Sequence, residues 1–154
     1  MTTPASTTVA ERPFPPVADL VPHSAPTLAL DELVAWAPGE AVLRLRIREH
    51  GLLVQDGAVD ASVTIELMAQ GAAACLGHAA FRGGGAVRVG MVVGCRKLQL
   101  LRPTLFVGED FVVTVRCTRG SDFVSSFDGE VHDAAGALVA RTTMTIVHAE
   151  QPPS

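Results

Sequence analysis

The sequence is short of cysteine, of basic charge and of long apolar runs, and each shortage excludes a class of protein. Its three cysteines, Cys75, Cys95 and Cys117, are odd in number and far apart, so they indicate neither a disulfide framework nor a zinc site. We therefore expect a reducing, cytoplasmic environment. The net charge of −4 gives no support to nucleic-acid binding. The longest apolar run, residues 67–81, is interrupted by two polar residues and is too short to span a membrane.

The length of 154 residues suits a single folded domain. Residues 1–15 are rich in Thr and Pro and lack the apolar core of a secretory signal, so we expect them to form a disordered tail. Residues 150–154 are expected to form a second, shorter tail. The folded domain is therefore expected over residues 16–149.

One carboxylate interrupts an otherwise apolar segment. Glu66 is the only acidic residue in residues 61–81, where most neighbours are Ala, Gly or larger aliphatic residues. A helix that is apolar on nearly every side is normally buried, and a buried carboxylate must be paired, hydrogen-bonded or protonated. We therefore expect Glu66 to be buried and to act as a proton donor. The alternative is a structural Glu66 that binds the backbone or an Arg across a dimer.

The residue pattern predicts one long helix and several strands. In residues 41–48 aliphatic residues alternate with Arg, which is the period of a half-buried strand. A helix is expected over residues 60–81, capped by Asp60 or Ser62 and ended by the sequence RGGG at 82–85. Four β-branched, partly alternating runs predict further strands, at residues 86–101, 110–118, 123–132 and 138–148.

This order of elements predicts the fold class. A strand, a long helix and then a run of strands indicate an α+β domain, in which one antiparallel sheet curls around the central helix. One sheet cannot cover every apolar side of that helix. We therefore expect at least a dimer, either of two identical chains or with a related subunit.

Three segments resemble the hotdog-fold 3-hydroxyacyl-[acyl-carrier-protein] dehydratases. The sequence IELMAQ at residues 65–70 resembles their helix motif, an acidic residue followed by xxAQ. The sequence LVPHSAPTLALDEL at residues 20–33 resembles their "PHRxPxLLxD" segment, and RPTLFVGED at residues 102–110 resembles their "RPVxPGD" connection. The resemblance implies a hotdog fold and the loss of water from 3-hydroxyacyl thioesters.

One part of the family pattern is absent. The typical dehydratase has GHFPxxPxxPG before the helix, with its catalytic base in the His, whereas this chain has EHGLLVQDGAVDASVTIE. Counting back from Glu66, the family spacing falls on Leu52, and the nearest histidine is His50. This segment is similar to the divergent aryl-polyene branch of the family, in which Asp-Gly recurs as it does at Asp56 and Gly57.

The resemblance implies a role for each candidate residue. Dehydration needs a base for the proton next to the carbonyl and an acid for the departing hydroxyl. Glu66 is expected to be the acid, with Gln70 one helical turn away to orient it. His50 is the first candidate for the base and His23 the second, close to the substrate. Backbone N–H groups of residues 59–63 are expected to bind the thioester oxygen.

The charge pattern suggests a partner. Residues 67–108 contain no acidic residue. An acyl carrier protein is acidic, so a local basic surface can steer it, and Gly90 and Gly94 would let its phosphopantetheine arm pass close to the strand. The alternative is a solvated strand edge protected by charge. The residues expected to bind the carrier are Arg88, Arg96, Lys97 and Arg102.

The sequence therefore predicts a cytoplasmic dehydratase that acts on carrier-bound 3-hydroxyacyl chains in fatty-acid or polyene-type biosynthesis. It predicts no metal and no cofactor apart from the phosphopantetheine that carries the substrate. Two alternatives stay open. One is an acyl thioesterase of the same fold, in which the helix carboxylate activates water, and the other is a non-catalytic subunit that binds acyl carriers.

Overall fold

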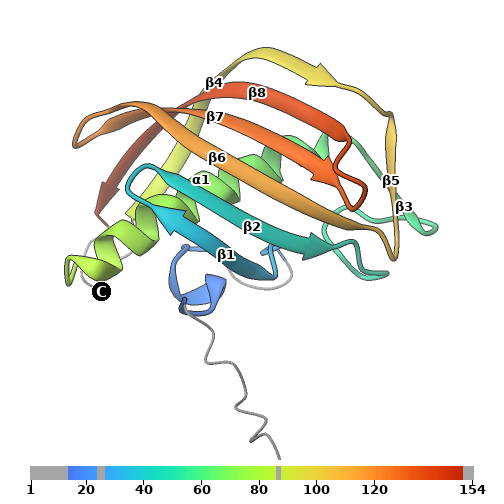
Figure 1. Ribbon diagram of the computed structural model, residues 1–154, viewed down its shortest axis with the longest axis horizontal. Helices are drawn as coiled ribbons and strands as arrows, with labels where there is room; N and C mark the ends of the chain where they lie inside the picture. Colours follow the sequence, from blue (N-terminus) through green and yellow to red (C-terminus); the bar gives the residue numbers. More distant parts are fainter. Residues whose placement is uncertain (1–13, 24–26, 86–87, 151–154) are drawn as a thin grey trace, which may run out of the picture.

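The computed structural model describes residues 14–23, 27–85 and 88–150, and these form one curled sheet packed on one helix (Figure 1). Residues 1–13 and 151–154 lie outside the described part of the chain, so the two expected tails stay predictions. In the part that is described, no helix is long and apolar enough to cross a membrane.

The main sheet is antiparallel throughout, with strand order β1–β2–β6–β7–β8–β4. Helix α1 (Val63–Arg82) lies along its concave face (Figure 1). Two short strands pair beside the main sheet, and a single 3-10 turn, η1, precedes β1. The remaining elements are η1 (Val17–Asp19), β1 (Glu32–Ala37), β2 (Glu40–Arg46), β3 (Ala58–Asp60), β4 (Arg88–Leu100), β5 (Thr104–Phe106), β6 (Asp110–Gly120), β7 (Val124–Asp133) and β8 (Leu138–Glu150). The predicted α+β architecture is confirmed.

Helix α1 begins and ends close to the predicted positions. Ser62 occupies the N-cap position, but its side chain makes no capping hydrogen bond. Asp60 instead accepts a hydrogen bond at Oδ1 from the Ser62 N–H, at 2.8 Å. Gly83 follows the last helical residue and donates its N–H to the Ala79 carbonyl at 3.2 Å. The RGGG sequence therefore ends the helix as predicted.

The N-terminal segment covers the side of α1 that the sheet leaves open (Figure 1). A Cβ added at Gly77 would lie 1.7 Å from the Leu20 carbonyl oxygen, so the backbone of this segment touches the helix directly and only glycine fits there. Leu20 is itself fully buried. The cover is incomplete, because Ala69, Ala73 and Leu76 stay only half-buried, so an apolar side of the helix remains partly open in the single chain.

Three strands, β1, β3 and β5, were not predicted from the sequence pattern. Residues 32–37, ELVAWA, do not alternate, yet they form β1, and a bulge between Leu33 and Ala35 shifts its register against β2. Strands β3 and β5 have only three residues each. Such short or bulged strands carry no period that a sequence pattern can reveal.

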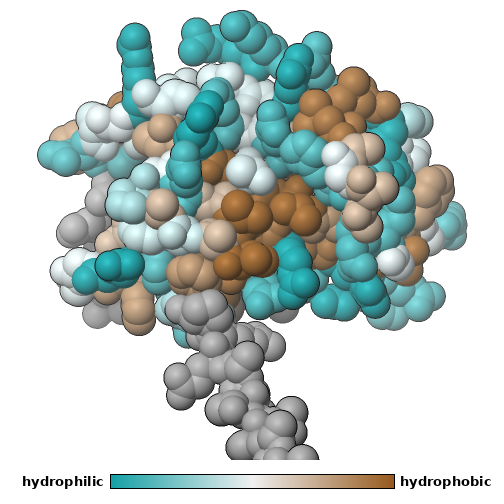
Figure 2. Space-filling model, viewed as in Figure 1, coloured by the Kyte–Doolittle hydropathy of each residue, from teal (hydrophilic) through white to brown (hydrophobic). Residues whose placement is uncertain are grey.

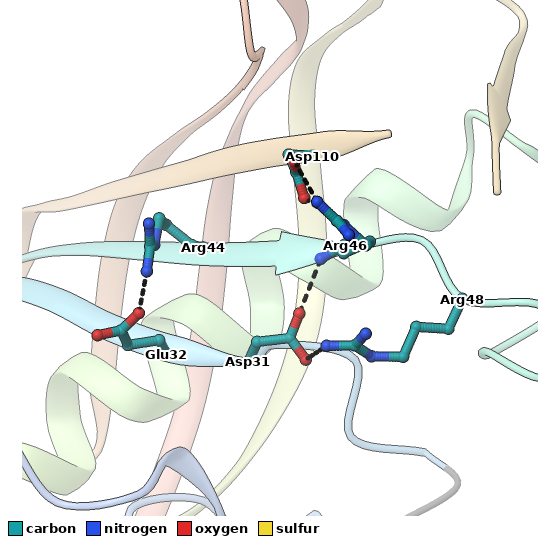
Figure 3. A network of polar contacts seen from close by, with 6 residues as sticks. All are labelled: Asp31, Glu32, Arg44, Arg46, Arg48 and Asp110. Atoms are coloured by element: carbon teal, nitrogen blue, oxygen red, sulfur yellow. Dashed lines mark hydrogen bonds and ion pairs between the residues drawn. The ribbon is translucent and has the colours of Figure 1, made fainter. Parts of the chain in front are cut away.

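Charged side chains join the outer faces of β1, β2 and β6 (Figure 3). Arg44 pairs with Glu32, and Arg46 pairs with Asp110 at 2.8 Å. Asp31 accepts a hydrogen bond from the Arg46 N–H at 2.7 Å and pairs with Arg48 at 3.0 Å. These pairs are exposed and individually worth little. The contacts of Asp31 with Arg46 and Arg48, however, fix the end of the N-terminal segment at β2. His23 belongs to the same segment.

Strand β4 is one of the two edge strands of the main sheet. It is a strand of 13 residues with no neighbour on one side among the described residues. Met91 and Val93 on this strand are 70% and 55% exposed. A hydrophobic area is also visible near the end of β4, at the upper right of Figure 2. A long, apolar strand edge is a template for pairing with another chain, so this edge is where we now expect the dimer to form.

We predict that Met91→Lys combined with Val93→Glu converts a dimer of this chain into a monomer, because charged side chains cannot be buried at an apolar edge. The protomer should keep its fold, since exposed substitutions change stability by about 0.5 kcal/mol or less. Sedimentation at micromolar concentration measures the change. Val34→Lys is the matched control, since Val34 is exposed on the other edge strand, β1. An unchanged dimer in the double variant would rule out the β4 edge.

Candidate active site

Gln70 connects the central helix to the N-terminal segment. Its side chain is fully buried in α1. Its Oε1 accepts a hydrogen bond from the Ala29 N–H at 2.9 Å. Its Nε2 donates to the Thr27 carbonyl at 2.9 Å and to Glu66 Oε1 at 3.0 Å. One amide therefore holds both the segment and the carboxylate in place.

Glu66 is more accessible than the sequence predicted. Its side chain is 39% exposed, so the expectation of a buried carboxylate is wrong for the single chain. It lies between Gln70 and His23, on the side of α1 that the N-terminal segment crosses. The carboxylate is fixed at one oxygen by the Gln70 amide, while the rest of the group stays open to a reactant.

His23 is the histidine that the fold brings to Glu66. Its Nε2 lies 3.5 Å from Glu66 Oε1, and its side chain is 27% exposed. Its Nδ1 is buried without a hydrogen-bond partner among the described residues. His50, the first candidate for the base, lies in the exposed turn after β2, and in the described part of the chain no hydrogen bond or ion pair joins it to Glu66. The choice of His50 over His23 is therefore not supported by the geometry.

A pocket extends from His23 along α1. It has an empty volume of about 380 Å³, mouth included, and runs between the helix and strands β4 and β8. On the helix side it is lined by Ala69, Ala73 and Leu76, which follow Glu66 at helical spacing on one face of α1. The lining residues are Pro22, His23, Ala69, Ala73, Leu76, Gly90, Val92, Ile146 and His148.

The helix residues that follow Glu66 differ in their access to this pocket. Gln70 and Gly77 face the N-terminal segment and are covered by it. Ala69 and Ala73 line the pocket. Gly90 lines it, whereas Gly94 does not, and a Cβ at Gly94 would meet nothing within 4 Å.

The expected oxyanion donors are largely engaged. The Ala61 N–H donates to the Pro103 carbonyl at 2.9 Å, and the Ser62 N–H donates to Asp60 at 2.8 Å. Buried backbone groups need a hydrogen-bond partner, and the acceptors here are the Pro103 carbonyl and the Asp60 carboxylate. These two groups are not free to bind a thioester oxygen.

The basic residues differ in their surroundings. Arg102 pairs with Glu109 and donates from Nε to the Thr104 carbonyl at 2.9 Å. The hydrogen bond from Arg102 holds the pKa of Glu109 below its usual value. Both the charge and the Nε of Arg102 are therefore engaged within the chain. Arg96 and Lys97 are exposed on β4, where a bulge places Lys97 at a φ of 56°. The side chain of Arg88 lies outside the described residues.

Two histidines of the last two strands also have polar neighbours. His132 lies 3.6 Å from Glu130. His148 lines the pocket, and its Nε2 is 2.8 Å from Ser125 Oγ. No sequence signal distinguishes His148, because only the sheet register brings its strand to the pocket. Within the described residues, no three His, Cys, Asp or Glu side chains gather as metal ligands.

Comparison with known proteins identifies the family signature. The sequence model of the ApeP-like family, described as ApeP dehydratase, matches residues 15–154. No curated protein matches the sequence.

Solved structures share the fold. The dehydratase heterocomplex ApeI:P from Xenorhabdus doucetiae is 22% identical with a TM-score of 0.82, covering 92% of this chain and 93% of that chain. A hypothetical thioesterase from Streptococcus pneumoniae TIGR4, solved with coenzyme A, is 14% identical with a TM-score of 0.59, covering 79% of this chain and 88% of that one. The E. coli PaaI protein is 14% identical with a TM-score of 0.58, and the match covers 80% of both chains. These likenesses confirm the predicted hotdog fold.

We predict that Gln70→Met lowers the free energy of unfolding by about 1–3 kcal/mol, because the part-buried Ala29 N–H and Thr27 carbonyl lose the buried amide that is their partner. Urea denaturation measures the loss. Gln55→Met, at an exposed position, is the matched control and should change stability little. If both variants lose the same amount, the Gln70 hydrogen bonds do not anchor the segment.

Proposed function

The chain belongs to the ApeP-like dehydratase family, and from this membership we propose that Glu66 and His23 carry its chemistry. The chain is a dehydratase, and its reaction is the loss of water from a 3-hydroxyacyl thioester in polyene-type biosynthesis, as the sequence predicted. The observation that supports the residue assignment is the carboxylate–imidazole pair, 3.5 Å apart, at the end of an apolar pocket.

The proposed reaction uses each group once. Neutral His23 removes the proton from the carbon next to the thioester carbonyl, and the C–H electrons form the new double bond. Protonated Glu66 gives its proton to the departing hydroxyl, which leaves as water. The site is then left with an imidazolium and a carboxylate, and a proton transfer from His23 to Glu66 restores the starting state. Their 3.5 Å separation supports that return.

The geometry also restricts where the substrate lies. At 3.5 Å the two groups leave no room for a substrate between them, so the reacting carbons must approach one face of the pair. The acyl chain then extends into the pocket along Ala69 and Ala73. No metal or redox cofactor is needed for these steps, and the substrate is held on phosphopantetheine.

The thioesterase alternative is weaker on this geometry. A helix carboxylate that activates water needs no imidazole, whereas this chain places His23 beside Glu66. Release of free acid, in place of loss of water, would mark hydrolysis.

We further propose that the chain works as a dimer, with a related hotdog subunit as the partner. The exposed β4 edge supports a partner of the same architecture, and the similar ApeI:P structure is described as a heterocomplex. Three free cysteines agree with a cytoplasmic location.

We propose an acyl carrier protein as the second partner. Arg96 and Lys97 are exposed on the strand whose earlier residues, Gly90 and Val92, line the acyl pocket. An acidic carrier bound there would stand close to the pocket that receives its acyl chain.

Glu66→Gln should lower dehydration at least about a hundredfold, because Gln keeps the hydrogen bond to Gln70 but has no proton to give. His23→Ala should cost a similar factor, while His50→Ala should stay close to wild type. Mass spectrometry of 3-hydroxyacyl carrier protein measures the loss of water, and thermal denaturation confirms folding. Full activity in Glu66→Gln contradicts the assignment. If Glu66→Gln is inactive and both histidine variants are active, the base comes from the partner subunit.

Reversing two charges, with Arg96→Glu and Lys97→Glu together, should lower kcat/KM for carrier-bound substrate by about tenfold or more, because steering by charge is lost. Activity on a small thioester mimic should change little. Arg116→Glu with Arg119→Glu is the control, since both residues are exposed on β6 and carry the same charge change. Equal losses on the two substrates would remove the docking role.

A further inference from the structure

The acyl pocket ends at a wall that separates it from a second pocket. Beyond that wall lies an open groove with an empty volume of about 770 Å³, next to the last turns of α1. Two side chains line both spaces, Leu76 from α1 and His148 from β8. No other residue is shared by the linings of these two pockets in the described part of the chain.

His148 is the rigid half of this wall. Its side chain is buried, and its Nε2 lies 2.8 Å from the Oγ of Ser125, which is also buried. Its backbone N–H donates to the Phe123 carbonyl at 2.8 Å. The His148 ring therefore cannot change its rotamer without losing the buried hydrogen bond at Nε2.

Leu76 is the part of this wall that a substitution can shorten. It lies ten residues after Glu66, which corresponds to about 15 Å along a helix. It packs on the core but is only half-buried, because it faces a pocket on each side. The groove behind it is lined on the helix by Cys75, Ala79 and Ala80, so small side chains continue the path beyond the wall.

We propose that Leu76, backed by His148, sets the longest acyl chain that this dehydratase accepts. The inference rests on the proposed function, because it assumes that the acyl chain runs from Glu66 along Ala69 and Ala73. A chain of medium length fills the pocket and stops at Leu76. A longer one meets the wall, and its last carbons stay in water. Ser125 is a positioning residue, since it acts only through the His148 ring.

The direct test is Leu76→Ala, which joins the pocket to the groove. The purified dimer is assayed on 3-hydroxyacyl thioesters of about six to about twelve carbons, where each added CH₂ that becomes buried should raise kcat/KM by about fourfold. We expect the ratio of kcat/KM for the longest chain over the shortest to rise at least about tenfold in the variant. Leu76→Phe should lower that ratio, because the larger ring shortens the pocket. Equal changes at all chain lengths overturn the proposal.

Two further variants separate the wall from general destabilisation. Leu138→Ala removes a half-buried leucine that lines neither pocket, so it should leave the ratio unchanged. Ser125→Ala frees the His148 ring and should shift the ratio in the same direction as Leu76→Ala. A shift in Leu138→Ala, or none in Ser125→Ala, overturns the role of the wall or of its support.

A binding measurement keeps this inference distinct from the proposed chemistry. Calorimetry with saturated acyl-pantetheines of graded length needs no turnover. Tighter binding of long chains by Leu76→Ala, with no dehydration by wild type, would support the wall and contradict the proposed reaction. Unchanged binding at every length, with normal dehydration, would contradict the wall alone.

Discussion

The buried amide of Gln70 is the interaction on which the site depends. It makes three hydrogen bonds at 2.9–3.0 Å, to Ala29, Thr27 and Glu66. A buried amide is tolerated only when its polar atoms are paired. The chain must therefore return across α1 at residues 27–29, and this return holds His23 next to Glu66. The same buried side chain thus anchors the N-terminal segment to the helix and brings the proposed catalytic pair, His23 and Glu66, together.

The crossing of α1 by the N-terminal segment also affects the inference from an apolar helix to a dimer. The close approach of the Leu20 carbonyl to Gly77 shows that the N-terminal segment lies directly on α1 and covers the helix there. Apolar side chains stay exposed on the sheet as well, among them Met91 and Val93 of β4. A helix composed of Ala and Gly is therefore a sign of close backbone packing and does not by itself indicate a dimer.

The sequence predicted what periodicity and local chemistry can encode. The helix, β2, β4 and the last three strands follow from their residue patterns, and the position of Gln70 one turn from Glu66 follows from helical spacing. The position of His23 does not follow, because it depends on how a segment some forty residues away in sequence crosses the helix. Counting residues back from Glu66 favoured His50. Which histidine lies next to Glu66 depends, however, on the path of the chain in the folded structure, and that path brings His23 there. The place of His148 between the two pockets could not be predicted either, because it depends on the register of the folded sheet.

Strand β4 links assembly to the pocket. Gly90 and Val92 line the pocket beside His23, while Met91 and Val93, which alternate with them, stay exposed. One strand therefore has one face toward the pocket, exposed apolar side chains on its other face, and an unpaired backbone edge. An edge strand without a neighbour opens more readily than one paired on both sides. Pairing by a partner would hold the pocket wall in place, so we expect acyl binding and assembly to support each other. This coupling gives a physical reason for a dimer in an enzyme whose single chain already contains both a carboxylate and an imidazole.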